Sequence, residues 1–259
     1  MVYKYINHRG LDLLRDHRIH ISRPSSFNDP FEFLPQAAVL TRQQIELRLS
    51  EPAFVDSFFQ HKLALREVND RPSFDKWLVD NRTAIVDAME NHARNYRPEE
   101  FAALAGKYFG VTCFAKISND LLMWAHYADS HKGMVIGFDE AAFGKHLRPV
   151  TYSPTRPEYH ELWPSDRSER YMEIMSVKSD HWAYEQEVRL IIAWAACEKD
   201  GEHFYRIEPN DVQDVILGCR TTPALESDAR TVLARDYPHV RLRQMRQHGD
   251  RYELVVTAV

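Results

Sequence analysis

A helical stretch without glycine, residues 41–105, lies between two segments that read as short strands, and this constrains the fold more than any other feature. Its apolar residues recur at helical spacing, and Thr41 and Ser73 are suitable helix N-caps. Short strands that return after grouped helices favour an α+β fold over a doubly wound α/β sheet. We therefore expect a single α+β domain over residues 1–259, with 41–105 as a helical insertion within it.

The segments on either side of the insertion show the alternation typical of strands. Before it, the chain reads strand, helix, strand, and then a loop with an Asn-Asp-Pro turn signal. The elements expected there lie at residues 2–6, 10–17 and 18–22. After it, strands are expected at 110–115, 132–139, 148–152, 202–207 and 212–217, helices at 119–129 (capped by Asn119) and 223–236, and a closing pair of strands. Residues 157–175 read as helical or irregular.

The charge and the cysteines exclude several classes of protein. The net charge of -5 and the pI near 6.2 argue against sequence-independent binding to nucleic acids or anionic membranes, which requires a basic surface. Three widely spaced cysteines without a C-x-x-C motif indicate neither a zinc site nor a disulfide framework. Without a signal peptide or a long apolar run, we expect a cytoplasmic protein with no membrane partner.

The common cofactor and hydrolase motifs are absent from the sequence. It contains no G-x-G-x-x-G, no G-x-x-x-x-G-K-[ST], no G-x-S-x-G and no H-E-x-x-H. Rossmann-type cofactor binding, Walker-type ATP binding, serine-hydrolase and zincin chemistry are therefore disfavoured.

The stretch HWAYEQEVRLII, residues 181–192, is the first candidate site. If it is one strand, Glu185, Glu187 and Arg189 share a face, with the Cα atoms of the two glutamates about 7 Å apart. Arg189 is then well placed to keep Glu187 ionised. The alternative is the solvated face of a half-buried strand.

A second candidate is MWAHYADSHKG, residues 123–133, with Trp124, His126 and Tyr127 on an expected helix. Its two histidines are five residues apart, which does not align two metal ligands on a helix, so no metal site is expected. The alternative is that these aromatic residues anchor the helix.

The third candidate is the loop SRPSSFNDPFE, residues 22–32, in which Ser22 follows a strand and Asn28 and Asp29 precede a proline. The alternative here is turn chemistry without a functional role.

These blocks together resemble a known family. YKY near the start, S-x-P-x-x-F-N-D-P-F-E, M-W-A-H-Y-A-D-x-H-K-G-x-x-I-G-F-D and W-x-Y-E-x-E-x-R-L occur in this order across most of the chain. The pattern resembles the prokaryotic family of unknown function numbered 2971. That family supplies no activity.

A weaker resemblance is to ADP-ribosyltransferase-like domains, and it implies a split mixed or antiparallel sheet with flanking helices. In those domains a first strand carries His, Arg or Tyr, a second carries Ser, Thr or Tyr, and a later one carries a catalytic Glu. By position, a residue of Tyr3-Lys4-Tyr5 would be the first element, Ser22 the second and Glu185-Gln186-Glu187 the third. The absence of His or Arg at the first position and the presence of Arg189 depart from the pattern.

The resemblance implies NAD as a substrate, with Glu187 stabilising the positively charged ribose and Glu185 orienting or deprotonating the acceptor. Tyr5 or Tyr127 would stack on nicotinamide. The residues expected to bind the nucleotide are Tyr3, Lys4, Tyr5, Ser22, Asn28, Asp29, Trp124, His126, Tyr127 and Arg189.

Three functions follow as hypotheses. The first is an ADP-ribosyltransferase-like enzyme or NAD-consuming effector of phage defence or a toxin system, with an unidentified macromolecular acceptor. The second is a metal-dependent nuclease that uses Glu185, Glu187, Asp129 and Lys178. The third is a non-enzymatic interaction or antitoxin-like module, which burial of Arg189 in an ion pair within a closed core would favour.

Overall fold

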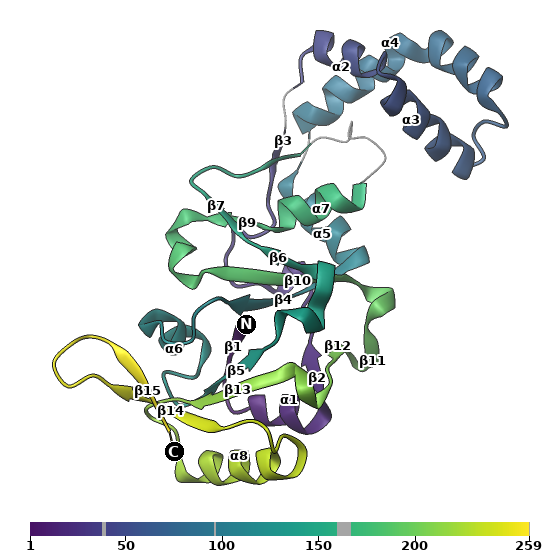
Figure 1. Cartoon of the computed structure of the whole chain (residues 1–259). Helices are drawn as coiled ribbons and strands as arrows, with labels where there is room; N and C mark the ends of the chain where they lie inside the picture. The colour runs from purple at the N-terminus through teal and green to yellow at the C-terminus, as the bar shows by residue number, and fades with distance from the viewer. Residues whose placement is uncertain (38–39, 96, 160–166, 259) are drawn as a thin grey trace. The chain divides into compact units, whose positions relative to one another are not determined.

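The computed structural model describes residues 1–37, 40–95, 97–159 and 167–258 (Figure 1). The chain forms two compact units. The first comprises residues 1–30, 106–154 and 178–259, and the second comprises 31–105 and 155–177. The region 41–105 that we expected as an insertion lies in the second unit.

The first unit is built on an eight-stranded mixed sheet. Its strands, in sheet order, are β15 (Leu254–Ala258), β14 (Leu242–Gln247), β13 (Val212–Leu217), β5 (Met134–Phe138), β1 (Val2–Ile6), β4 (Phe109–Ala115), β10 (Glu187–Ala193) and β6 (Leu147–Pro149). β13 and β14 are parallel, and the other neighbours are antiparallel. This mixed sheet with flanking helices confirms the α+β class.

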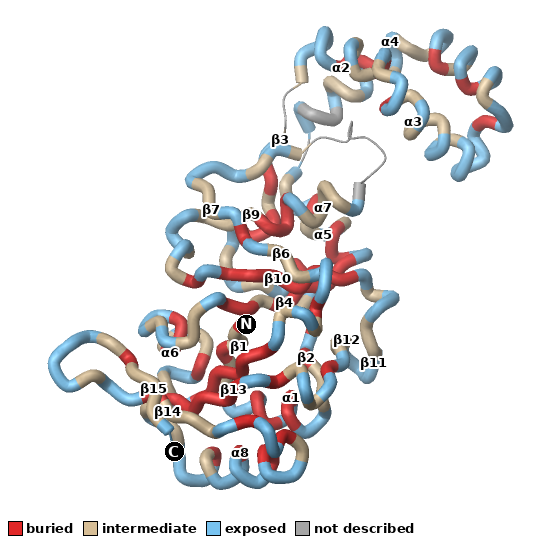
Figure 2. Tube along the Cα trace, in the orientation of Figure 1, coloured by how far each residue is buried: buried red, intermediate tan, exposed pale blue. Residues whose placement is uncertain are grey.

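Helices pack on the two faces of the sheet. Helices α1 (Gly10–Asp16) and α8 (Pro223–Asp236) share one apolar core with alternate residues of β5, β10 and β13. Tyr237 joins these two helices, because its hydroxyl lies 2.8 Å from the carbonyl of Leu14. Helix α6 (Leu121–Tyr127) packs with a second core that contains Trp124 and residues of β1, β4 and β13. Figure 2 shows the buried strands between the exposed surfaces of these helices.

Smaller elements complete the first unit. A three-stranded sheet contains β11 (Glu198–Asp200), β12 (Glu202–Arg206) and β2 (Arg18–His20). A two-stranded sheet contains β7 (Thr151–Ser153) and β9 (Val177–Ser179). The 3-10 turns are η1 (Pro24–Ser26), η2 (Glu140–His146), η3 (Asp180–Glu185), η4 (Trp194–Ala196) and η5 (Pro209–Asp211).

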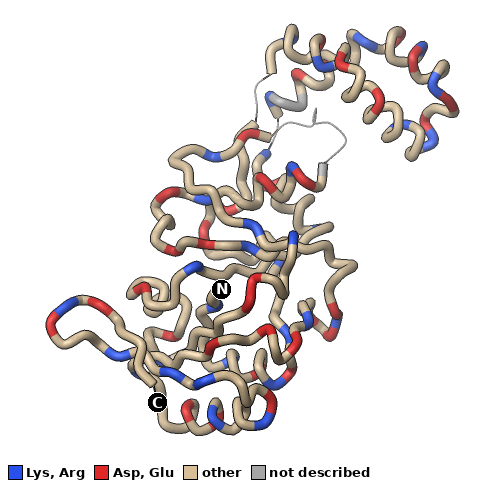
Figure 3. Tube along the Cα trace, viewed as in Figure 1, with Lys and Arg blue, Asp and Glu red and all other residues tan. Residues whose placement is uncertain are grey.

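The second unit is mainly helical. It contains α2 (Arg42–Arg48), α3 (Pro52–Ala64), α4 (Arg71–Asn95), the start of α5 (Pro98–Tyr108), α7 (Arg167–Met175) and the parallel pair β3 (Gln36–Ala37) and β8 (Glu158–Tyr159). Ile45, Phe54 and Phe74 are central in its apolar core. Figure 3 shows acidic and basic residues interspersed along α2, α3 and α4.

Two expected helix caps are wrong, and one is confirmed. Thr41 caps α2 in a capping box with Gln44. Ser73 instead lies inside α4, where its backbone N–H donates to the Asp70 carboxylate at 2.8 Å. Asp120, and not Asn119, caps α6, because its carboxylate accepts from the Met123 backbone N–H at 2.9 Å. In both corrections a carboxylate accepts the hydrogen bond.

The strands at 2–6 and 212–217 and the helix at 223–236 are confirmed. In the segment 157–175, residues 160–166 lie outside the described part of the chain, and α7 follows them. No helix within the described residues is both long and apolar enough to cross a bilayer.

Candidate functional site

The stretch 181–192 is not one strand. Asp180–Glu185 form the 3-10 turn η3, which Ser179 caps through a bond from the His181 N–H to its hydroxyl. Gln186 adopts a left-handed conformation with φ of 44°, and β10 begins at Glu187. The expectation that Glu185 shares a strand face with Glu187 is therefore wrong. The turn nevertheless brings both carboxylates to one lysine.

Glu187 is held by groups from three strands. Its Oε1 lies 2.7 Å from Nε of Arg189, and its Oε2 lies 3.2 Å from another guanidinium nitrogen of Arg189. The backbone N–H of Glu187 donates to the hydroxyl of Tyr152 at 2.7 Å. The Cys113 thiol is close enough to the Glu187 carboxylate to help lower the pKa of that carboxylate. Arg189 is fully buried and Glu187 is 4% exposed, so the pair is shielded from solvent.

Lys178 joins the two glutamates. Its Nζ lies 2.5 Å from Oε2 of Glu185 and 2.9 Å from Oε2 of Glu187. The same ammonium lies 5.1 Å from the centre of the Trp182 ring, a cation–π distance. The other oxygen of Glu185 accepts from the Tyr127 hydroxyl at 2.7 Å. We call Tyr127, Lys178, Glu185, Glu187 and Arg189 the carboxylate cluster.

The two carboxyl groups of the cluster have opposite pKa shifts. Burial raises the pKa of Glu185 above its usual value, against the opposing effects of Lys178 and Tyr127. Burial acts in the same direction on Glu187, but Arg189 and Lys178 outweigh it and lower the pKa of Glu187 to about 2. Glu187 is therefore a fixed anion at neutral pH, as expected from its neighbour Arg189. Glu185 is the group that exchanges protons more readily.

The sheet register decides which residue of the YKY block shares a face with Glu187. Glu187 and Tyr3 both stand opposite Ala115 of β4, on its two neighbouring strands, so their side chains lie on one face. Tyr5 shares that face, because it is two residues further along β1. Lys4 points to the other face, where its ammonium donates to Thr112 at 2.7 Å and burial lowers its pKa.

Helix α6 contributes one residue to the carboxylate cluster and uses another as an anchor. Tyr127 contacts Glu185, as described above. Trp124 is fully buried, donates to the Ser118 carbonyl at 2.8 Å and packs edge-to-face on Tyr5. His126 is exposed beside Tyr127. The anchoring alternative thus describes Trp124, whereas Tyr127 belongs to the candidate site.

The loop residues lie elsewhere in the first unit. Ser22 forms an isolated antiparallel bridge with Val111 of β4, and its hydroxyl lies 3.4 Å from Nδ1 of His20. Asn28 is exposed and Asp29 is half-buried in the loop after η1. The nucleotide-binding roles of these three residues stay predictions.

The nucleotide-binding set expected from the sequence omitted three contacts of the site. The sequence assigns Lys178 only to the metal-dependent nuclease hypothesis. In the structure its ammonium lies between two carboxylates and takes the place that a metal ion would have there. Tyr152 and Cys113 read as ordinary strand residues in sequence, and no local pattern marks them. They reach Glu187 because β7 and β4 pass close to the start of β10.

The cluster offers charge stabilisation and proton transfer. Among the described residues, no three His, Cys, Asp or Glu side chains gather at metal-binding distance. Lys178 instead supplies the cation between Glu185 and Glu187. Asp129, the further carboxylate of the nuclease hypothesis, is exposed in the turn after α6.

Comparison with known proteins relates part of the chain to a family model. The model of the family DUF2971, described as "Protein of unknown function", matches residues 123–190. No curated protein and no solved structure gives a significant match. The matched segment includes all five residues of the carboxylate cluster, and it supports the resemblance to this family of unknown function.

Proposed function

We propose that the chain is an ADP-ribosyltransferase-like enzyme that consumes NAD as a substrate, with Glu187 and Glu185 as its catalytic pair. The observation that carries this proposal is the sharing of Lys178 by two buried carboxylates whose pKa values shift in opposite directions. Environments that separate the pKa values of two neighbouring carboxyl groups divide acid–base roles between them.

Each glutamate has a distinct task in the proposed reaction. Cleavage of the bond between nicotinamide and ribose leaves the bonding electrons on nicotinamide and positive charge on the ribose. Glu187, ionised beside Arg189, stabilises that charge. The acceptor then bonds to the ribose carbon, and its proton passes to Glu185, whose raised pKa makes it the stronger base. The products are nicotinamide and an ADP-ribosylated acceptor, or free ADP-ribose when water is the acceptor.

Both glutamates are buried, which restricts the access of a substrate to them. Glu185 and Glu187 are 3% and 4% exposed, so the ribose reaches them only after a local opening. The side chain of Tyr127 lies against Glu185, and Tyr152 lies at the backbone of Glu187. A role in phage defence or in a toxin system is part of the proposal.

Nicotinamide release from NAD tests the proposal. The full chain is incubated with NAD, with and without candidate protein and nucleic-acid acceptors. Glu187→Gln should lower the rate at least about 100-fold, the usual effect of removing a stabilising group from the transition state. Glu140→Gln is the matched control, because Glu140 forms an exposed pair with Lys116. Equal turnover by wild type and Glu187→Gln would refute the assignment.

A second candidate is a non-enzymatic interaction module, and the complete burial of Arg189 in its pair with Glu187 favours it. In that case the carboxylate cluster is structural. Nicotinamide release would then be absent from wild type with every acceptor, and Glu187→Gln would affect only stability. The two candidate functions are therefore distinguished by whether the wild-type protein releases nicotinamide from NAD.

A further inference from the structure

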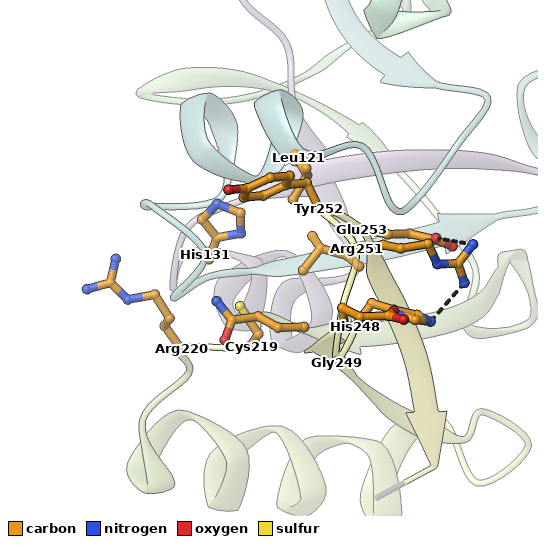
Figure 4. A pocket seen from close by; sticks show the side chains of 12 residues that line it. Leu121, His131, Cys219, Arg220, His248, Gly249, Arg251, Tyr252 and Glu253 are labelled. Carbon is orange, nitrogen blue, oxygen red and sulfur yellow. Dashed lines mark hydrogen bonds and ion pairs between the residues drawn. The ribbon is translucent and has the colours of Figure 1, made fainter.

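A groove on the first unit lies away from the carboxylate cluster. Its volume is about 600 Å³, within the range of small-molecule sites. The β14–β15 hairpin forms one wall, and Leu121 of α6, His131 and the segment after β13 form the other (Figure 4). In the sheet order, β14 lies five strand positions from β10, roughly 24 Å. None of the residues that line the groove belongs to the carboxylate cluster, although Leu121 and Tyr127 lie on the same helix.

The His131 wall is formed by strained backbone. Asp129, Ser130 and His131 are three consecutive non-glycine residues with positive φ, of 48°, 51° and 69°. Such residues each cost about 1–2 kcal/mol and persist only where their surroundings fix them. The His131 N–H donates to the Trp124 carbonyl at 3.1 Å, and its carbonyl accepts from the Arg220 N–H at 3.0 Å. Strain of this kind gathers at functional sites.

The charges around the groove leave one cation without a partner. Glu253 pairs with Arg251 at 3.1 Å, and the Asp250 carboxylate lies 2.7 Å from the His248 ring. In the described part of the chain, the exposed guanidinium of Arg220 has no ion-pair partner. With its histidines neutral, the groove has no net charge, because Arg220 and Arg251 balance Asp250 and Glu253. Both carboxylates lie on the hairpin side, and the unpaired guanidinium of Arg220 is on the side that carries His131.

Two further groups are available to a ligand with a planar ring, an unpartnered ring nitrogen and an exposed aromatic side chain. Nδ1 of His131 is buried without a hydrogen-bond partner among the described residues, and burial followed by the charge of Arg220 lowers the pKa of this histidine. Tyr252 is fully exposed at the hairpin tip, and Figure 4 shows its ring at the opening of the groove. An exposed tyrosine offers a stacking surface for a nucleobase.

We propose that this groove binds a nucleotide, with its base on Tyr252 and its phosphate held by Arg220 beside His131. The proposal goes beyond the NAD-consuming activity and does not depend on the carboxylate cluster. Arg220 reaches the phosphate by rotation of its exposed side chain, since Figure 4 shows the guanidinium directed away from the groove.

Isothermal titration calorimetry of the full chain with AMP tests the proposal. Adenosine and inorganic phosphate are the partial probes, and each should bind at least about tenfold more weakly than AMP. Arg220→Gln and Tyr252→Ala should each weaken AMP binding roughly tenfold, because one loses a charged hydrogen bond and the other a stacking partner. Both side chains are exposed, so both variants should fold, as circular dichroism will show.

The controls separate this proposal from the proposed function. Arg241→Gln removes an exposed arginine outside the groove lining and should leave AMP affinity within about twofold. Arg220→Gln and Tyr252→Ala should leave nicotinamide release from NAD within about twofold of wild type, because neither residue belongs to the carboxylate cluster, so the two proposals can fail independently. No AMP binding at millimolar concentration, or binding that ignores both Arg220→Gln and Tyr252→Ala, overturns the nucleotide site.

Discussion

Replacement of Lys178 by methionine tests the electrostatic description of the carboxylate cluster. Coulomb's law with an effective dielectric constant of about 20 gives roughly 6 kcal/mol for each contact of its ammonium, at 2.5 and 2.9 Å. In the wild type, removing the ammonium from water costs several kcal/mol, and this cost offsets part of the attraction. The variant leaves two buried carboxylates with Arg189, and breaking a buried ion pair of this kind costs about 3–5 kcal/mol.

Protonation of Glu185 limits that cost and makes it depend on pH. Neutralising an ordinary glutamate takes about 4 kcal/mol at about pH 7.5 and about 2 kcal/mol at about pH 5.5. In the variant the folded pKa of Glu185 lies above its unfolded value, so the folded state binds the extra proton and stability falls as pH rises. We expect Lys178→Met to lose about 4 kcal/mol of unfolding free energy near pH 7.5 and about 2 near pH 5.5.

Urea unfolding followed by tryptophan fluorescence measures both values, and Trp182 lies against Lys178. Lys116→Met is the matched control, because Lys116 and Glu140 form an exposed pair 2.7 Å apart. That substitution should cost at most about 1 kcal/mol at either pH. A loss below about 1 kcal/mol for Lys178→Met, or a loss that is the same at both pH values, would refute the electrostatic reasoning.

Two further predictions concern stability. Gly218→Ala should cost about 3 kcal/mol in urea unfolding, because its Cβ would lie 2.0 Å from the His131 carbonyl oxygen, which cannot rotate away. Gly249→Ala, whose Cβ meets nothing within 4 Å, should unfold as wild type does. Thr41→Ala should cost about 1 kcal/mol by removing the cap that pairs with Gln44, and recovery of full stability in Thr41→Ser would assign the loss to the hydroxyl.

Local patterns in the sequence predicted many of the regular elements, but the single strand expected at 148–152 is two strands, β6 and β7, which belong to different sheets. The strands at β1 and β13 and the helix α8 could be located from the sequence, because their signals arise from neighbours a few residues apart. The pairing of Glu187 with Arg189 was predictable for the same reason, since residues two apart on a strand share a face. For the sheet, the sequence predicted the α+β class of the fold but not the order of the strands.

The carboxylate cluster itself required the tertiary structure. Lys178 meets Glu185 and Glu187 because a turn at Gln186 breaks the alternation that the sequence indicated. Tyr127 reaches Glu185 from a position 58 residues away in the chain. Contacts of this range depend on strand order and register, which the hydrophobic pattern of one chain does not specify. The sequence alone therefore determined which residues carry charge, and the fold decided that two carboxylates share one lysine.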